Sequence, residues 1–460
     1  MSARDKAAEL MAAHGMPVEQ HSGQLRMAHR LVARYRDRLR YVYGIGWHEW
    51  DGVRWKRDDS GAATRAATDT IKAAFSDLAD LDREGRQDLL RDIRRCESAS
   101  GLEGMLRIAA SMLPFATAID QLDADPYLLN VANGTLDLRT LQVRPHDPAD
   151  LLTKVAGCGY DPEGQAPRFE QFLAEILPDA AIRGYVARVL GHALPGQVLE
   201  HVLAIFTGTG QNGKSTLIEV AGMAAFGDYA MAAEPDLLVD RGAVHTTGQA
   251  DLLGVRLAVC SETDEGRKLA AATVKRLTGG DKVRARRMRQ DNIEFTPSHT
   301  VLMVTNHKPK VAGDDPALWR RLRIVPFDVV VANPDKRLRQ QLELELPGIL
   351  RWLVDGYRDW NDNGLDEPAS VTAATEAYRA TSDALGRFLD ECVHQTPFGT
   401  VKARELFGLW SSWCHENGET PGSEVTFAEA MSQRGLKKTK RNGGQTYIGL
   451  MLLDSSEAAS

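Results

Sequence analysis

The chain has 460 residues, of which 43% are hydrophobic and 26% are charged, and its formal net charge is −7. This length is too great for one ordinary core, so two or three domains are expected. The negative charge argues against a protein that coats nucleic acid over its whole surface, because that role needs a basic surface throughout.

Cysteine spacing and apolar runs exclude further classes. The five cysteines are scattered, without a CxxC pair or a histidine cluster at zinc spacing, which argues against both a disulfide framework and a zinc site. No apolar run approaches the roughly 20 residues that span a bilayer, and the first residues lack a signal-peptide core. We therefore expect a cytoplasmic protein that makes no membrane contact.

The first 160 residues are predicted to form an α+β N-terminal region. Helical patterns surround residues 41–59, where Gly and Asp-Gly turn signals separate Tyr, Trp and Val and predict a hairpin. Residues 128–148 predict further short strands with a turn at Asn133 and Gly134. Residues 161–167, DPEGQAP, have the composition of a linker.

Residues 161–365 are predicted to form an α/β nucleotide-binding domain. Helical patterns in residues 168–195 are interrupted at Pro178. Residues 201–226 then read as an apolar strand, a glycine-rich loop and an apolar helix, which begins such a domain. Further strands are predicted at residues 256–262, 299–306 and 322–329.

The glycine-rich loop GTGQNGKS fits the phosphate-binding pattern GxxxxGK[ST]. Its glycines let the backbone N–H groups curl around an anion. Lys214 is expected to reach the β- and γ-phosphates of ATP, and the Ser215 hydroxyl to ligate Mg²⁺. The alternative is a glycine turn that ends in Lys-Ser by chance, which the flanking strand and helix disfavour. The predicted nucleotide-binding residues are Gly208, Thr209, Gly210, Gln211, Asn212, Gly213, Lys214, Ser215 and Thr216.

Polar residues end the next two predicted strands. A P-loop enzyme needs an acid at the end of a neighbouring strand to hold metal-bound water and accept its proton, and Glu262 is placed for that role. Asp264 and Glu265 are substitutes, and a solvated glutamate is the structural alternative. Asn306 ends the following strand, where an amide can contact the γ-phosphate and orient water.

A strongly basic segment, residues 275–289, separates these strands. It holds seven basic residues and one acid, and the alternation of Lys282, Arg284 and Arg286 suggests one face of a hairpin strand, with Arg287 and Arg289 near its tip. We favour contact with a DNA backbone over a solvated edge strand, because one sign of charge dominates.

Paired arginines follow beside Trp319. Arg320 or Arg321 can neutralise a γ-phosphate bound by a neighbouring subunit, and Arg321 is preferred. Surface salt bridging is the alternative.

In this order, the segments GTGQNGKST, RLAVCSE, KRLTGGDKVRARR, TVLMVTNHKP and DPALWRRLRIVPF resemble the phage and plasmid primase-helicase family of superfamily III, which includes the poxvirus primase-helicase. The resemblance covers about residues 128–327. It implies an AAA-type P-loop ATPase core, a ring of six copies that hydrolyses ATP between subunits, and movement along single-stranded or forked DNA. It also implies an origin in a phage, prophage or plasmid within a bacterial host cell.

The resemblance assigns residues 208–216 to the phosphates, Glu262 to the acidic motif, Asn306 to the sensor and Arg320 or Arg321 to the trans-acting finger. Many members of the superfamily have two adjacent acids where this chain has Ser261 before Glu262, so the second Mg²⁺ ligand is left open.

Primases of this family carry a polymerase-like domain upstream of the helicase. The acids Asp123 and Asp125 are better read as a solvated turn than as its catalytic pair. We therefore expect a helicase without priming activity, with a separate primase or polymerase as a partner.

Residues 370–460 resemble the winged-helix ending of these proteins. Lys437, Lys438, Lys440 and Arg441 are expected to face DNA phosphate, although a solvated basic turn fits nearly as well.

Two other functions share the same motifs. The first is a P-loop ATPase that loads another helicase or melts an origin. The second is a replication initiator switched by ATP binding. A small-molecule kinase fits less well, because it has no use for a long basic hairpin.

Overall fold

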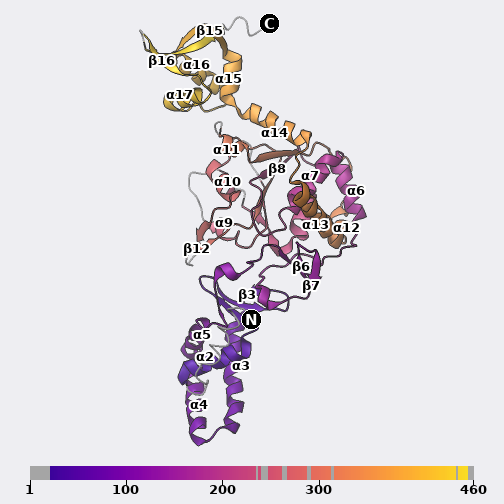
Figure 1. Ribbon diagram of the computed structural model, residues 1–460, viewed down its shortest axis with the longest axis vertical. Coiled ribbons are helices and arrows are strands. Elements are labelled where there is room, and N and C mark those ends of the chain that lie inside the picture. The colour runs from indigo at the N-terminus through magenta and orange to yellow at the C-terminus, as the bar shows by residue number, and fades with distance from the viewer. Residues whose placement is uncertain are drawn as a thin grey trace.

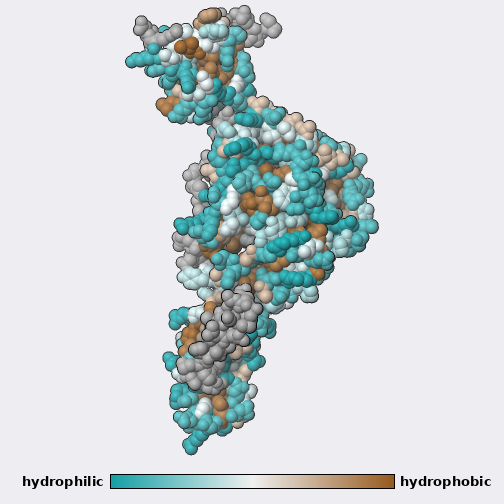
Figure 2. Space-filling model, in the orientation of Figure 1, coloured by the Kyte–Doolittle hydropathy of each residue, from teal (hydrophilic) through white to brown (hydrophobic). Residues whose placement is uncertain are grey.

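The computed structural model describes residues 21–234, 237–239, 247–261, 267–286, 292–311, 315–441 and 444–453. Three parts follow one another along the long axis of the molecule: an N-terminal part, a central part built on a parallel sheet, and a C-terminal part reached through α14 (Ala369–Ser382) (Figure 1). Hydrophilic side chains cover most of the central part in this view (Figure 2). Within the described ranges, no helix is long and apolar enough to cross a membrane.

The N-terminal part packs helices against a four-stranded sheet with the order β3-β2-β1-β4. The predicted hairpin is present as the antiparallel meander β1-β2-β3. Gly44 and Gly46 take positive φ angles of 79° and 113° between β1 and β2, a conformation that glycine adopts most readily. The elements are α2 (Gly23–Tyr35), β1 (Leu39–Val42), β2 (Gly46–Trp50), β3 (Trp55–Arg57), α3 (Ala62–Asp77), η2 (Leu78–Asp80), α4 (Arg83–Cys96), α5 (Ala99–Ala110), β4 (Ala116–Thr117) and η3 (Ile119–Gln121).

A second antiparallel sheet, β5-β6-β7, follows and turns at Asn133 and Gly134 as predicted. A Cβ at Gly134 would lie 2.4 Å from the carbonyl oxygen of Arg144, so the turn requires glycine. Buried residues of this sheet, such as Leu136, share one core with helices of the central part. The division of the chain at residues 160 and 365 stays a prediction. The elements are β5 (Leu128–Val131), β6 (Gly134–Asp137), β7 (Gln142–Arg144) and η4 (Pro148–Asp150).

The central sheet has five parallel strands in the order β14-β8-β13-β10-β9. Successive residues of β8 (Leu203–Thr207) enter two different cores: Leu203 and Ile205 pack on one face, Ala204 and Phe206 on the other. Both faces are therefore covered, as parallel sheets require. The three predicted strands after β8 are present as β10 (Leu257–Ser261), β13 (Thr300–Thr305) and β14 (Leu322–Pro326).

The fifth strand, β9 (Ala230–Ala233), was not predicted from the sequence. The predicted break at Pro178 separates the first two helices of the central part, and the helix after the glycine-rich loop continues from an α-helical turn into a π-helix, η5. The helices of this part are α6 (Pro167–Ile176), α7 (Ala180–Gly191), α8 (Lys214–Leu217), η5 (Ile218–Ala224), η6 (Gly227–Tyr229), α9 (Thr247–Ala250), α10 (Ala271–Leu277), α11 (Pro316–Trp319), α12 (Leu338–Glu343) and α13 (Leu346–Asn363).

Two further units are attached to this sheet. The predicted basic hairpin is formed by β11 (Val283–Arg286) and β12 (Asn292–Phe295), which pair antiparallel. The C-terminal part has a three-stranded antiparallel sheet of order β15-β17-β16 around an aromatic core that includes Trp410. Its elements are α15 (Ala384–Cys392), β15 (Val393–Lys402), α16 (Ala403–Glu416), α17 (Glu424–Gln433), β16 (Lys438–Arg441) and β17 (Gly444–Leu452).

Candidate nucleotide-binding site

The glycine-rich loop joins β8 to α8 and has a tightly constrained backbone. Positive φ angles occur at Gly210 (95°), Gln211 (49°) and Gly213 (78°). A Cβ at Gly208 would lie 2.2 Å from the carbonyl oxygen of Phe327, and one at Gly213 would lie 2.5 Å from a methyl group of Ile176 in α6. The close packing explains why glycine is needed at both positions.

Lys214 is the buried cation of this loop, with 3% of its surface exposed. Its Nζ donates to the carbonyl oxygen of Gly208 at 2.8 Å, to Asn212 Oδ1 at 3.0 Å and to Asn306 Oδ1 at 3.2 Å. Burial lowers the pKa of Lys214. Within the part of the chain that the structure describes, all its partners are neutral oxygens and no carboxylate pairs with it. An ammonium held in this way can exchange neutral acceptors for an anion.

Asn212 clamps the loop to the sheet. Its Nδ2 donates to the carbonyl oxygen of Phe327 at 3.1 Å, while its Oδ1 accepts from Lys214. The backbone carbonyl of Gln211 also accepts from Val331 N at 2.8 Å. Asn212 was predicted from the sequence as a nucleotide-binding residue of the loop, without this contact to Phe327. Its role as a buried link to the segment after β14 depends on contacts between distant residues.

The other loop positions form the outer surface. Thr209, Gln211 and Ser215 are exposed, and Thr216 is half-buried. The Ser215 hydroxyl is therefore accessible at the first turn of the helix, where the expected Mg²⁺ ligand would have to lie.

The predicted sensor Asn306 meets the glycine-rich loop. It directly follows β13, which pairs with β8 through Thr305 and Thr207. Because the carboxyl ends of parallel strands share one edge of the sheet, Asn306 and Lys214 come within hydrogen-bonding distance although 92 residues separate them.

Glu262 was expected at the end of the strand beside the P-loop strand. That placement is wrong in one respect: β10 pairs with β13 and β9, so β13 lies between it and β8. Ser261, the last residue of β10, pairs with Val304 at the same edge of the sheet. Glu262, Asp264 and Glu265 lie outside the described residues.

Arg320 and Arg321 lie at the opposite edge of the sheet from the glycine-rich loop. The carbonyl of Arg321 accepts from Leu203 N at 2.7 Å, at the start of β8, whereas the loop follows its end. Five strand residues separate the two edges by about 16 Å. Neither guanidinium is therefore placed to contact a phosphate on its own chain's loop.

The two arginines also differ from each other. Arg321 is half-buried and its Nη1 donates to the carbonyl of Ala317 at 2.6 Å. Arg320 is exposed and lines a cavity of about 270 Å³ between α11 and α14. The geometry thus favours Arg320 over the preferred Arg321 as the arginine free to reach outward.

The basic hairpin alternates as predicted. Val283 and Ala285 are buried, and Lys282 and Arg284 are exposed. An acid that sequence analysis did not weigh lies across the hairpin: Glu294 Oε2 accepts from Arg284 Nε at 2.8 Å, and Glu294 Oε1 lies 3.8 Å from Lys282 Nζ. The Arg284 hydrogen bond lowers the pKa of Glu294. This acid reduces the local excess of positive charge at the base of the hairpin.

The remaining predicted DNA contacts are only partly described. Arg286 ends β11 and Arg441 ends β16, with the backbone alone described at each. Arg287 and Arg289 lie outside the described residues. Lys437, Lys438 and Lys440 are exposed on β16 and the residue before it.

Asp123 and Asp125 are engaged within the fold. Asp123 accepts from Thr153 N at 2.9 Å and from Thr153 Oγ1 at 2.5 Å, and burial raises its pKa. Asp125 accepts from Arg139 at 2.6 Å and from Tyr127 N at 3.1 Å. Asp123 lies in a turn and is half-buried, and both carboxylates hold local structure.

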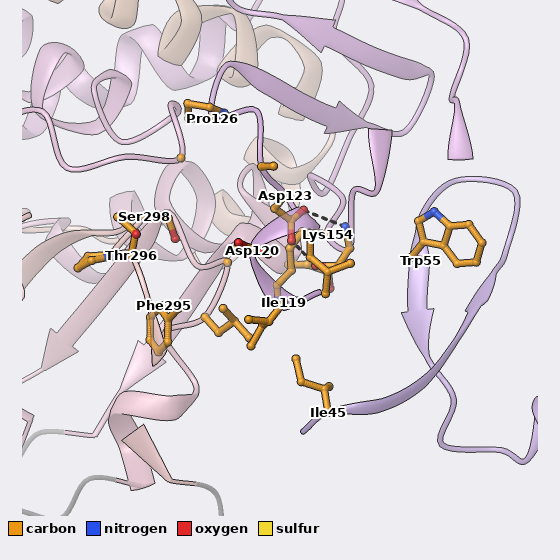
Figure 3. A pocket seen from close by; sticks show the side chains of 18 of the residues that line it. Ile45, Trp55, Ile119, Asp120, Asp123, Pro126, Lys154, Phe295, Thr296 and Ser298 are labelled. Carbon is orange, nitrogen blue, oxygen red and sulfur yellow. Dashed lines mark hydrogen bonds between the residues drawn. The ribbon is translucent and has the colours of Figure 1, made fainter. Parts of the chain in front are cut away.

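Asp123 lies on the wall of a cavity of about 920 Å³ between the N-terminal and central parts. Figure 3 shows Lys154 beside Asp123, with Ile45 from the turn between β1 and β2 and Phe295 from the basic hairpin around the same space. Positive and negative side chains both line this cavity, so its charge favours neither an anion nor a cation.

Two segments of the chain match models of known families. Residues 28–178 match a family model described as D5 N terminal like, and residues 206–321 match one described as a family of unknown function (DUF5906). Relatives include a protein of Acanthamoeba polyphaga mimivirus named a putative helicase, 24% identical over 82% of this chain and 44% of its own length.

Other relatives have similar names. A putative helicase of Invertebrate iridescent virus 6 is 24% identical over 78% of this chain and 41% of its own length, and a putative primase of African swine fever virus is 24% identical over 68% and 36%. The chain thus spans less than half the length of these curated relatives. The solved NrS-1 C-terminal region aligns with 63% of this chain and 77% of that chain at 13% identity and a TM-score of 0.39. The chain is thus similar, at low identity, to viral proteins named helicases and primases, and part of it matches the D5 N terminal like model.

Proposed function

We propose that this chain is an ATP-driven DNA translocase of a replication module, with an AAA-type P-loop core. The observation that carries the proposal is the convergence of Gly208, Asn212 and Asn306 on the ammonium of Lys214. Three neutral acceptors hold the cation where the glycine-rich loop and the end of β13 meet. The names of the viral relatives, helicase and primase, support a role in replication.

The residues present fit ATP with Mg²⁺. Lys214 would exchange its neutral acceptors for phosphate oxygens, residues 208–216 would surround the phosphates, and the exposed Ser215 hydroxyl would ligate the metal. Bound ATP would supply the phosphoanhydride bond whose hydrolysis drives movement. Asn306 would orient water, and Glu262, the next residue in the sequence after β10, is our proposed proton acceptor and a further metal ligand.

The strand order supports the AAA-type assignment, and the position of Arg320 supports a ring. Counting the parallel strands along the chain as 1 to 5, the order is 5-1-4-3-2, which inserts strand β13 with its sensor between the P-loop strand β8 and strand β10. Arg320, exposed and about 16 Å from its own loop by strand length, suits an arginine finger that acts on the neighbouring copy. We propose a homo-hexamer on this basis.

We further propose that DNA runs along the basic hairpin and the C-terminal part. The order helix, strand, helix, helix, strand, strand from α15 to β17 is compatible with a winged helix, and Lys437, Lys438 and Lys440 are free of ion pairs among the described residues. Arg286, Arg287, Arg289 and Arg441 are assigned to DNA by sequence alone. Single-stranded or forked DNA and a separate primase or polymerase are the proposed partners.

The test is unwinding of a forked duplex with ATP and Mg²⁺ by the full chain and two variants. Lys214→Ala should abolish strand separation, because the cation on the phosphates is lost. Arg284→Gln should weaken single-strand binding modestly and uniformly across sequences, while basal ATP hydrolysis persists. Strand separation by Lys214→Ala at the parent's rate would overturn the proposal. ATP hydrolysis without strand separation by the parent would instead favour a helicase loader.

A further inference from the structure

A second candidate binding surface lies on the N-terminal part, far from the glycine-rich loop. It is a groove of about 860 Å³ between the sheet and the carboxyl end of α5. The groove is lined by Tyr41 on β1, by Tyr43 just after β1 and by Trp47 on β2. We propose that this groove is a stacking platform for the bases of single-stranded DNA. The inference deepens the proposed function, since it adds a second contact for the same strand.

The three rings line the same groove. Trp47 is the cross-strand partner of Tyr41, so these two side chains lie on one face of the sheet, and Tyr43 follows in the turn after β1. Trp47 packs edge-on against Tyr41 at 5.2 Å and against Phe115 at 5.4 Å between ring centroids. These contacts hold its ring in place. Tyr43 is 78% exposed, so its ring is accessible to a stacking base.

The opposite wall supplies apolar surface and one cation. Leu106 and the 67% exposed Leu113 line the groove, and Arg107 lies beside them on α5. No carboxylate of the described ranges forms an ion pair with Arg107. A base that stacked on the rings would bring its phosphate to this wall, where the guanidinium can contact it.

Arginine and aromatic residues alternate in the segment that leads into the groove. Residues 34–43 read RYRDRLRYVY, with four arginines and one acid. Arg36 and Arg38 are exposed, and their ion pairs with Asp37 at 3.8 Å and Glu49 at 3.3 Å lie in solvent, where such pairs contribute little. This composition, unlike that of the whole chain with its net charge of −7, suits a phosphate backbone.

One acid, Glu103, also lines the groove, one helical turn before Arg107. Because Glu103 and Arg107 carry opposite charges, the direction of each change in DNA affinity can be predicted. DNA phosphate is attracted by Arg107 and repelled by Glu103, so removal of the two charges should change DNA affinity in opposite directions. An apolar protein surface seated on the same rings would respond weakly to both.

The experiment measures binding of a fluorescein-labelled 20-nucleotide oligo(dT) to the full chain by anisotropy, without nucleotide. Tyr43→Ala should weaken binding roughly 5- to 100-fold, as loss of one stacked base does. Arg107→Gln should weaken it and reduce the salt slope by about one, whereas Glu103→Gln should strengthen it. Phe75→Ala, which removes a 44% exposed ring on α3 outside the groove, is the control and should leave affinity unchanged.

Photo-crosslinking with 5-iodouracil in the same oligonucleotide locates the contact. Crosslinks at residues 41–47 are expected. Crosslinks confined to the hairpin or to the C-terminal part, with Tyr43→Ala binding like the parent, overturn the platform and leave the proposed function intact. Unchanged DNA affinity with lost self-association in mass photometry would overturn it in favour of a second copy of the chain. Failure of ATP hydrolysis would count against the proposed function alone, because this assay contains no nucleotide.

Discussion

Replacing Asn306 by aspartate tests the link between the two strand ends. The change puts a negative charge where Asn306 Oδ1 now lies, 3.2 Å from Lys214 Nζ. Two unit charges at that distance attract by about 5 kcal/mol at an effective dielectric constant of 20. The cost of desolvating a carboxylate offsets part of this, so the net penalty for drawing Lys214 away from phosphate is of order 2 kcal/mol. ATP affinity should therefore fall about 30-fold.

Equilibrium titration with a fluorescent ATP analogue measures this change. Asn306→Ala removes the oxygen without adding charge, so affinity should stay near that of the parent, while turnover falls about 10²- to 10³-fold if the amide orients water. Asn361→Asp on the exposed end of α13 controls for the charge itself. If Asn306→Asp binds the analogue as tightly as the parent, Asn306 does not share the phosphate site with Lys214.

Three further outcomes follow from the geometry. Burial lowers the pKa of His299 from 6.5 to about 4. The contribution of His299 to the free energy of unfolding is therefore complete above pH 6.5 and is lost as pH falls toward 4, by about 2 kcal/mol at pH 5. His299→Leu should flatten that part of the pH profile of stability measured by urea denaturation. Gly213→Ala forces a Cβ against α6 and should reduce ATP affinity more than Gly210→Ala, whose Cβ meets nothing within 4 Å. Equal losses of affinity would show that the packing of Gly213 against α6 does not matter for ATP binding. Arg320→Ala should bind ATP yet lose most turnover, and mixing it with Lys214→Ala should restore some hydrolysis; a fully active Arg320→Ala protein would contradict a trans-acting finger.

Much of the central fold could be predicted because its signals are local. The apolar runs that became β8, β10 and β13 are continuous, as strands buried on both faces must be. The phosphate-binding loop was predicted from its spacing and from the strand and helix patterns on either side of it. β9, Ala230–Ala233, was missed because alanine and methionine carry little strand propensity. Its pairing with β10 supplies what its sequence does not.

The rest depended on contacts between distant segments. Arg256 is fully buried and stacks over Tyr229 at 4.3 Å, while its Nη2 donates to the carbonyl of Leu128 at 2.6 Å. No local pattern distinguishes it from a surface arginine. Similarly, only the strand order reveals that β13 separates β8 from β10 and that Arg320 lies at the edge of the sheet opposite the loop.

The most direct test of the account is the steady-state rate of ATP hydrolysis, measured with Mg²⁺ in the presence and absence of single-stranded DNA. The full chain should hydrolyse ATP faster with DNA, and Lys214→Ala should be inactive in both conditions while retaining the parent's circular dichroism. Lys72→Ala, which removes an exposed lysine of α3, should behave like the parent. DNA-stimulated hydrolysis that survives Lys214→Ala would contradict the assignment of the glycine-rich loop as the ATP site.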